Sequence, residues 1–420
     1  MNQALKKPWG IVIMLCATAT AGYICRVNIS TAAPLLMKEF GLTQIEMGRI
    51  FSSFLLGYAL FQVPSGAIAD RFGARRVLSF IAWLWLILTV FQTVVGWGPF
   101  HTGAVTSLLI LMVFRFLLGI TASPTYPGSA QGVSKWVLPE YQGRANGIVI
   151  ASIGIGSALA PPLVSNIMVS FGWRPALIVS ALPALIIGLI WFKVREPVHF
   201  NIHALAANTA AFSVNSEKKG TINSVSFYLL TLSYTLQGYV GYIFVSWFYL
   251  YLVQERHFGL LSGAWMSSLP WILSIISIPL GGWISDRMVS GRPGPVWGRR
   301  IVPLTGMAAS GILISIGAHT GSAAVAAISL AFATAMILCV EGPFWATMMG
   351  IAGTKSGTAG GIMNMGSNIG GLISPALTPV IASLIGWENA LHVAAFLAIT
   401  GALLWLGIKP INPPTLLKGG

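Results

Sequence analysis

Three ionisable side chains lie within long apolar stretches of this sequence. Arg26 stands in GYICRVNIS, Arg115 begins RFLLGITASPTYP, and Glu341 stands in CVEGPFW. An arginine at the centre of a membrane-spanning helix costs roughly 2.5–3.5 kcal/mol on insertion scales, so it is a candidate functional residue. Its planar guanidinium can hold a carboxylate through two parallel hydrogen bonds. The alternative for Arg26 is a structural arginine that is held by backbone carbonyls of neighbouring helices.

Glu341 is the one acid that lies well inside an apolar segment. Burial favours the protonated form of a carboxylic acid, and a nearby arginine favours the ionised form. A carboxyl group in such surroundings could take up and release a proton. Two alternatives remain open at this point, which are a static ion pair with Arg26 or Arg115 and a contact with a cationic part of a substrate.

Other polar and aromatic residues of the apolar segments are weaker candidates. Asn364 and Asn368 lie four residues apart and therefore share one face of a helix. Each amide needs a partner, either on a neighbouring helix or among the hydroxyl groups of a substrate. An aromatic wall of the same site is predicted from Tyr239, Tyr242 and Trp345.

The composition defines the setting of these residues. The chain has 420 residues, of which 55% are hydrophobic and only 8% are charged, whereas about a quarter of the residues of a soluble protein are charged. The chain is therefore a multi-pass membrane protein, which must span the bilayer with helices or as a closed barrel. Its apolar runs are long and continuous rather than alternating, so we predict an all-α membrane protein.

Runs of about 20 apolar residues predict twelve membrane helices. The predicted helices cover 10–34, 47–69, 77–97, 104–128, 146–170, 173–193, 225–253, 261–284, 302–320, 323–350, 357–385 and 388–409. The long polar interval between the sixth and seventh helices divides them equally. We expect an N-terminal six-helix bundle over 1–195, a cytoplasmic linker over 196–224 and a C-terminal six-helix bundle over 225–420.

The basic residues predict the orientation. Most of the 24 Lys and Arg residues fall in the termini and in alternate loops on one side, and few fall in the loops on the other side. Loops rich in Lys and Arg remain in the cytoplasm. We therefore place both termini in the cytoplasm and the chain in a bacterial-type inner (plasma) membrane. The net charge of +14 then reflects these loops and does not indicate a nucleic-acid partner.

Two similar loops indicate an internal repeat. GAIADRFGARR follows the second predicted helix, and GWISDR with a later GRR follows the eighth. In each, the Asp could pair with an arginine across the turn, and the Gly could let a neighbouring helix approach closely. We interpret them as conformational-switch loops that contain Gly66, Asp70, Arg71, Arg75 and Arg76 in the first half and Gly282, Asp286, Arg287, Arg299 and Arg300 in the second.

The first loop resembles the signature of the major facilitator superfamily. Within it, the chain is similar to the anion:cation symporter branch, which includes sialin, the vesicular glutamate transporters and carriers of hexuronate, galactonate and tartrate. The resemblance extends over nearly the whole chain through YICRVNIS, FSSFLLGYALFQVPSGAIADRFGARR, RFLLGITASPTYP, GPFWA and GIMNMGSNIGGLISP. It implies two pseudo-symmetric six-helix bundles around a central cavity, lined by the first, fourth, seventh and tenth helices, with alternating access. Internal repeats and helices interrupted by Gly and Pro agree with a transporter.

The resemblance also implies roles for single residues. Arg26 would bind a carboxylate of the substrate, and the hydroxyl of Tyr58 would donate beside it unless Tyr58 is an ordinary packed tyrosine. Cys25 and Ala122 stand where proton-coupled members often carry acids. When Pro124 and Pro343 are aligned, Glu341 occupies the position equivalent to Ala122 in the other half. Glu341 is therefore the candidate for proton coupling.

The predicted function is secondary active transport of a small organic anion, such as a carboxylate, sugar acid or tartrate-like acid, with a proton as co-substrate. If Arg115 faces the cavity freely, a dianion is a plausible substrate, and if Glu341 neutralises it, a monoanion suffices. The alternatives are an uncoupled facilitator or exchanger, and a membrane sensor that kept the fold without transporting. We expect a monomer in the lipid bilayer with no cofactor and no metal, and the sequence offers no catalytic constellation for an enzyme.

Overall fold

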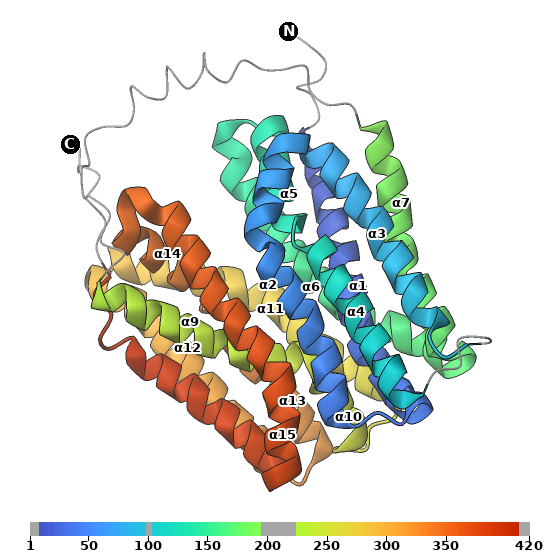
Figure 1. Ribbon diagram of the computed structural model, residues 1–420. Helices are drawn as coiled ribbons and strands as arrows, with labels where there is room; N and C mark the ends of the chain where they lie inside the picture. Colours follow the sequence, from blue (N-terminus) through green and yellow to red (C-terminus); the bar gives the residue numbers. More distant parts are fainter. Residues whose placement is uncertain (1–7, 98–102, 195–223, 411–420) are drawn as a thin grey trace.

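The computed structural model describes residues 8–97, 103–194 and 224–410, which form helices and no strands. Figure 1 shows the helices in two groups, one from each half of the chain. The first group contains α1 (Pro8–Phe40), α2 (Gln44–Phe72), α3 (Ala74–Val94), α4 (Ala104–Ala122), α5 (Thr125–Trp136), α6 (Pro139–Phe171) and α7 (Trp173–Lys193). The second contains α9 (Val225–Ser246), α10 (Phe248–Gln254), α11 (Leu260–Ser290), α12 (Gly294–His319), α13 (Ala323–Leu338), α14 (Glu341–Ala352) and α15 (Ser356–Leu404).

The helices of the described residues account for the twelve predicted ones. Ten helices are long and apolar enough to cross a membrane, and α9 and α10 together make a further span that is bent by 51°. The 49-residue α15 holds two predicted helices, because Gly386 has a non-helical backbone with φ of 84° and divides it. The predicted all-α membrane fold is confirmed. The predicted linker over 196–224 lies, apart from Ser224, outside the described residues.

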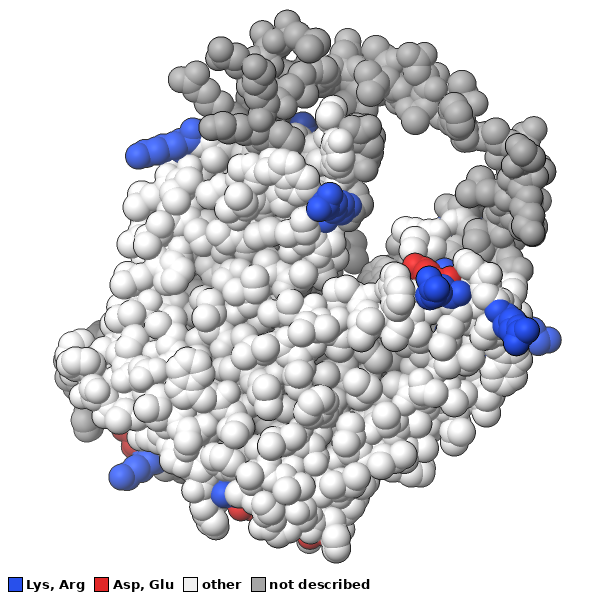
Figure 2. Space-filling model, turned by 180° about the vertical axis from the view of Figure 1, so that it is seen from behind, with Lys and Arg blue, Asp and Glu red and all other residues white. Residues whose placement is uncertain are grey.

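One face of the molecule carries a broad uncharged region. On the face shown in Figure 2, Lys, Arg, Asp and Glu gather at the two ends, with a broad region free of charge between them. Large apolar side chains of the helices are also exposed, among them Val63, Phe80 and Ile276 at 85%, 64% and 65%. Such exposure fits a surface that contacts the hydrocarbon of a bilayer rather than water.

Close helix contacts repeat between the two halves. In the first half, Gly119 of α4 lies against the carbonyl of Phe54 in α2, where a Cβ atom on the glycine would come 2.0 Å from that oxygen. In the second half, Gly281 of α11 lies against the carbonyl of Cys339 after α13, and the corresponding distance is 1.9 Å. The second and fourth membrane helices of each half are therefore packed backbone to backbone through a glycine.

Two helix pairs, α2 with α15 and α6 with α11, make the most extensive contacts between the halves. In the first pair, Gly48 lies against the carbonyl of Pro375, and Ser52 donates a hydrogen bond of 2.8 Å to the carbonyl of Leu372. In the second, Ser268 donates to the carbonyl of Ala158 at 2.6 Å. These contacts hold the two halves together.

The halves converge at one end of the molecule and part at the other. Gln44 at the start of α2 accepts a hydrogen bond of 3.1 Å from the indole of Trp387 and donates to Gln254 at 2.9 Å. Figure 1 shows the bundles meeting at this end, near α10, and separating toward the end that holds α5 and α14. Figure 2 shows a notch in the surface at that second end. We refer to these as the closed end and the parted end.

The basic residues of the repeated loops tie each half together. Arg75 donates to the carbonyls of Trp191 and Phe192 at the end of α7, at 3.3 and 2.8 Å. Arg300 donates to the carbonyl of Ile408 just beyond α15, at 2.8 Å from its Nε. A cation at the carboxyl end of a helix is favourable both as a donor and for the helix dipole. The two arginines therefore make equivalent contacts in the two halves.

Two further predictions were an Asp–Arg ion pair and a close helix approach at the Gly of each loop. Both are met only in the loop of the second half. Asp286 pairs with Arg299 at 2.5 Å, whereas Asp70 forms no ion pair within the described residues and is exposed. The prediction of a close neighbour at Gly66 is wrong, because nothing lies within 4 Å of a Cβ placed there, while Gly342 approaches Gly282. The first loop lies at the parted end, where α2 extends beyond its contact with the other half. Arg71, Arg76 and Arg287 of the two loops are likewise exposed.

Gly119→Ala should lower the stability of the protein, because the added methyl group would overlap the Phe54 carbonyl and force α4 away from α2. Overpacking of this kind costs about 1–3 kcal/mol. The control is Gly147→Ala in α6, where nothing lies within 4 Å. Thermal unfolding of the purified protein in detergent should show a lower midpoint for Gly119→Ala and an unchanged or slightly higher one for Gly147→Ala. Equal midpoints would contradict the proposed backbone packing.

Candidate functional site

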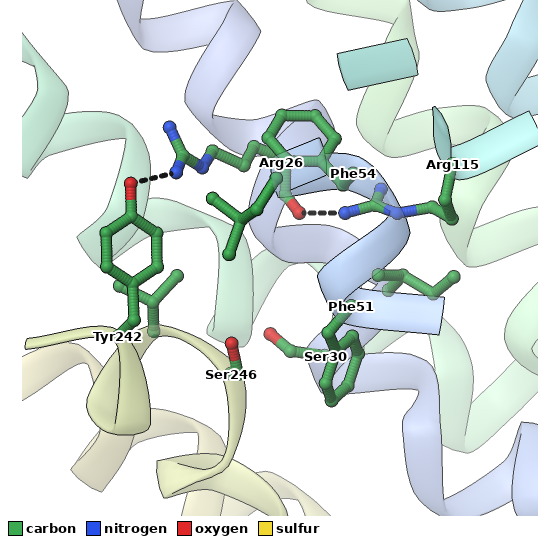
Figure 3. A pocket seen from close by; sticks show the side chains of 10 residues that line it. Arg26, Ser30, Phe51, Phe54, Arg115, Tyr242 and Ser246 are labelled. Carbon is green, nitrogen blue, oxygen red and sulfur yellow. Dashed lines mark hydrogen bonds between the residues drawn. The ribbon is translucent and has the colours of Figure 1, made fainter. Parts of the chain in front are cut away.

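A pocket lies between the halves, lined by side chains from four helices (Figure 3). Helices α1, α2 and α4 of the first half and α9 of the second provide its wall. The lining residues are Arg26, Ile29, Ser30, Phe51, Phe54, Leu55, Arg115, Tyr242, Val245 and Ser246. The pocket is narrow, with a cavity volume of about 20 Å³, well below the volumes of ligand sites that hold a bound molecule. Its wall therefore combines an apolar surface with two cations and three hydroxyl groups.

Arg26 is held by aromatic residues. Its Nη2 donates a hydrogen bond of 2.6 Å to the hydroxyl of Tyr242, and its Nη1 donates to the hydroxyl of Tyr23 at 3.3 Å. The guanidinium carbon lies between 5.0 and 5.3 Å from the ring centroids of Tyr23, Phe54, Tyr58 and Tyr242. Aromatic faces attract a cation without neutralising it. The side chain is thus fixed in position while its charge remains available.

Within the part of the chain that the structure describes, no acid forms an ion pair with Arg26. The ion pairs among the described residues join Arg174 with Glu39, Arg299 with Asp286, and two histidines with Glu388. Arg26 itself is only 8% exposed. A buried, unpaired guanidinium is costly unless a counter-charge arrives, and this one stands at the wall of a pocket. The arrangement can therefore hold an anion.

Arg115 is held differently, by the backbone. Its Nη1 and Nη2 donate to the carbonyls of Cys25 and Arg26 in α1, at 3.4 and 2.9 Å. The side chain is 2% exposed, and its guanidinium carbon lies 4.8 Å from the ring centroid of Phe54. The sequence left open that Arg26 is a structural arginine held by backbone carbonyls. In the structure, it is Arg115 that forms hydrogen bonds of this kind. This residue fastens α4 to α1 at the position that carries Arg26.

The α2 helix supplies an aromatic column beside both arginines. In Figure 3, the Phe54 ring lies between the guanidinium groups of Arg26 and Arg115. Tyr58, one turn further along α2, stacks on Phe54 with ring centroids 6.3 Å apart. The structure therefore places Tyr58 beside Arg26, although outside the lining of the pocket itself. Tyr126 of α5 extends the group by a hydrogen bond of 3.4 Å to the hydroxyl of Tyr23.

Glu341 occupies a separate polar site in the second half. At the start of α14, it accepts hydrogen bonds from the hydroxyl of Tyr234 at 2.9 Å and from the amide of Gln237 at 3.0 Å. Both donors belong to α9. Glu341 forms no ion pair with Arg26 or Arg115 among the described residues. The structure thus gives no support to the static ion pair considered from the sequence, and the carboxyl group has neutral partners.

Helix α9 connects the two sites. Tyr234 and Tyr242 are eight residues apart, and residues at this spacing share one face of a helix. Tyr234 bonds to Glu341, and Tyr242 bonds to Arg26. One face of α9 therefore contacts the candidate proton site in its own half and the arginine of the other half.

The remaining predicted residues lie outside the pocket lining. Tyr239 bonds instead through its hydroxyl to Thr378 at 3.2 Å. Trp345 packs edge-on against Tyr234 at 6.5 Å and so belongs to the surroundings of Glu341. Asn368 donates to Gln62 of α2 at 2.9 Å, which makes it a link between the halves. Asn364 lies one turn earlier and is half-buried. Of the predicted aromatic wall, only Tyr242 lines the pocket.

Sequence reasoning missed several residues of the two sites. Tyr23 precedes Arg26 by three residues, and Phe54 precedes Tyr58 by four. These are the helical spacings that bring side chains together, so both residues could have been found by extending the search along one face. Tyr234 and Gln237 gave no such signal, because their partner Glu341 is distant in the sequence.

The family model of the Major Facilitator Superfamily matches residues 14–375. The chain belongs to this superfamily. It is 29% identical to the "Probable sulfoacetate transporter SauU" of Cupriavidus necator, over 98% of this chain and 96% of that protein. It is 28% identical to the "Hexuronate transporter" of Bacillus subtilis, over 96% of this chain and 94% of that protein.

The fold of the superfamily is also found by structure comparison. A bacterial homologue of the human lysosomal transporter Spinster, solved in an inward-facing and occupied conformation, superimposes with a TM-score of 0.77 at 17% identity. The match covers 97% of each chain. The predicted resemblance to this superfamily and to its anion:cation symporter branch is confirmed, and the fold and family are those of transporters rather than enzymes.

Tyr242→Phe should weaken the binding of an organic anion by about tenfold. The Tyr242 oxygen accepts a hydrogen bond from Arg26, so its own proton is free to be donated to an anion held by the guanidinium. Loss of one such bond to a charged group is worth about 1.5–3 kcal/mol. Tyr239→Phe, which removes a hydroxyl that bonds to Thr378, is the matched control. Binding is measured by ligand-induced thermal shift, and equal losses in both variants would refute this role of Tyr242.

Proposed function

We propose that this protein is a secondary transporter that carries a small organic anion across the membrane by alternating access. The observation that carries the proposal is the guanidinium of Arg26, buried at the wall of a pocket between the two halves and without an acidic partner among the described residues. A carboxylate or sulfonate group can satisfy this guanidinium through charge-assisted hydrogen bonds. Substrate and protein would then neutralise each other inside a low-dielectric site.

The relatives support the substrate class. Their names give sulfoacetate and hexuronate as transported compounds, and both are organic acids with a short carbon skeleton. The acidic group of such a compound can be bound by an arginine of the pocket wall. We therefore propose an organic acid anion as the substrate.

We further propose that transport is coupled to a proton and that Glu341 carries it. The partners of Glu341 are a hydroxyl and an amide, both of which can bond to a protonated or an ionised carboxyl group. No ion pair fixes the charge of this residue in the described structure. Cys25 and Ala122 cannot serve in its place, because neither side chain is a carboxylic acid.

The sidedness of the molecule follows from the basic loops. If these loops lie in the cytoplasm, as the positive-inside rule predicts, both termini are cytoplasmic and the parted end faces the cytoplasm. The structure would then represent an inward-open state in a bacterial inner membrane. All residues of the pocket come from one chain, so a monomer would be sufficient for transport.

Arg26→Gln should abolish counterflow of the transported anion in proteoliposomes, because the neutral amide cannot replace the lost charge. Arg26→Lys should keep a small fraction of the activity, since lysine keeps the charge but not the fork of donors. Sulfoacetate, D-glucuronate and D-galactonate are suitable first probes.

Arg49→Gln is the matched control, because Arg49 is an exposed arginine of α2 away from the pocket. Normal counterflow in Arg26→Gln would rule out the proposed role of Arg26. A wild-type protein that binds these anions and moves none would instead be a sensor.

Glu341→Gln should abolish accumulation of the anion driven by an acidic exterior, while exchange of anion for anion at equal pH continues. The glutamine can keep the hydrogen bonds to Tyr234 and Gln237 but cannot release a proton. Glu255→Gln, which alters an exposed acid, is the control. Unchanged proton-driven accumulation in Glu341→Gln would remove this residue from the coupling mechanism, and its absence in the wild type would indicate an uncoupled exchanger.

A further inference from the structure

The pocket between the halves contains two cations. Arg26 and Arg115 both line it, and the other eight lining residues are apolar, aromatic or hydroxyl-bearing. Arginine stays protonated in proteins under all ordinary conditions. The described wall of the pocket therefore carries two positive charges and no negative one.

We propose that the substrate is a dianion, in which one acidic group binds Arg26 and the second is neutralised by Arg115. This inference rests on the proposed function, since it assumes that the pocket receives an anion. It assigns the substrate class by charge, and it gives Arg115 a role in selectivity in addition to its hydrogen bonds with α1.

The hydrogen bonds of Arg115 leave its charge uncompensated. Its partners are the carbonyl oxygens of Cys25 and Arg26, which are neutral groups. The acid of the other half, Glu341, bonds to Tyr234 and Gln237. Burying an ion without a counter-ion costs several kcal/mol even after the protein relaxes. A second anionic group in the pocket would offset this cost.

Arg115 also has one N–H group that forms no hydrogen bond within the described structure. Its Nε is buried and has no hydrogen-bond partner among the described residues. An unsatisfied buried donor is unfavourable, and more so when it is charged. Arg115 thus lacks both a counter-charge and an acceptor, and a carboxylate supplies both.

The arrangement of the two arginines limits the shape of the dianion. Both guanidinium carbons lie within cation–π distance of Phe54, at 5.0 Å for Arg26 and 4.8 Å for Arg115. Figure 3 shows the phenyl ring between them. A substrate that contacts both guanidinium groups has to reach past this ring. The two acidic groups must therefore be joined by a short spacer, for which Ile29, Leu55 and Val245 provide an apolar surface.

The test compares acids with monoamides of the same size. Succinate and malonate are dianions at slightly alkaline pH, whereas succinamate and malonamate are monoanions of nearly the same shape. We expect the purified wild-type protein to bind each dianion at least about tenfold more tightly than its monoamide, in thermal-shift titrations and as competition in counterflow. In Arg115→Gln this ratio should fall to near one, while Arg115→Lys, which keeps the charge, should retain most of it.

A second variant, Ala122→Glu, tests the same inference if Arg115→Gln does not fold. Ala122→Glu adds an acid seven residues after Arg115, on the same face of α4, and should reverse the preference in favour of the monoamides. A wild-type ratio near one overturns the inference, as does tighter binding of sulfate than of the dicarboxylates. If neither dianions nor monoanions bind or exchange, the proposed function fails instead.

Discussion

A positive charge that is buried between the two halves, with no acid among the described residues beside it, constrains the rest of this structure. The guanidinium of Arg26 is surrounded by the rings of Tyr23, Phe54, Tyr58 and Tyr242, which fix its direction but leave its charge in place. An acidic side chain beside this guanidinium would have neutralised its charge within the protein. Instead, the second arginine binds backbone carbonyls, and the acid of the interior is bonded to neutral groups. The uncompensated charge is therefore a property of the whole interior and not of one residue.

The two halves repeat their packing but not their chemistry. A glycine brings the second and fourth membrane helices together in each half, and Arg75 and Arg300 bind the end of the last helix of each half. These equivalences show that the halves share one architecture. The cations of the interior, however, belong to α1 and α4, and the acid belongs to α14. Opposite charges thus stand on opposite sides of the interface, where a relative movement of the halves would change the distance between them.

Much of the fold and part of the site could be predicted from the sequence, and the difference has physical causes. Long apolar runs are the direct consequence of contact with lipid, so they predict the membrane helices well. They also predict the break at Gly386 between the last two membrane helices. Arg26 and Glu341 were found because a charge in such a run is costly. Two results were not predictable in this way, which are that Asp70 forms no ion pair among the described residues and that Tyr239 lies outside the pocket lining. Both depend on how helices rotate and where the halves part. Residues such as Tyr234 and Gln237, which are ordinary in a membrane helix, gain their importance only from tertiary contact with Glu341.

Helix α9 is where the two charges can influence each other. Its Tyr242 accepts a hydrogen bond from Arg26 across the interface, and its Tyr234 and Gln237 bond to Glu341 within the second half. An anion that binds Arg26 can also accept a hydrogen bond from the hydroxyl of Tyr242. Its arrival therefore alters the contact that joins α1 to α9, on the face that also bonds to Glu341. In the proposed cycle, binding of the anion and the charge of Glu341 are then linked through one rigid element, without the need for a direct contact between substrate and proton carrier.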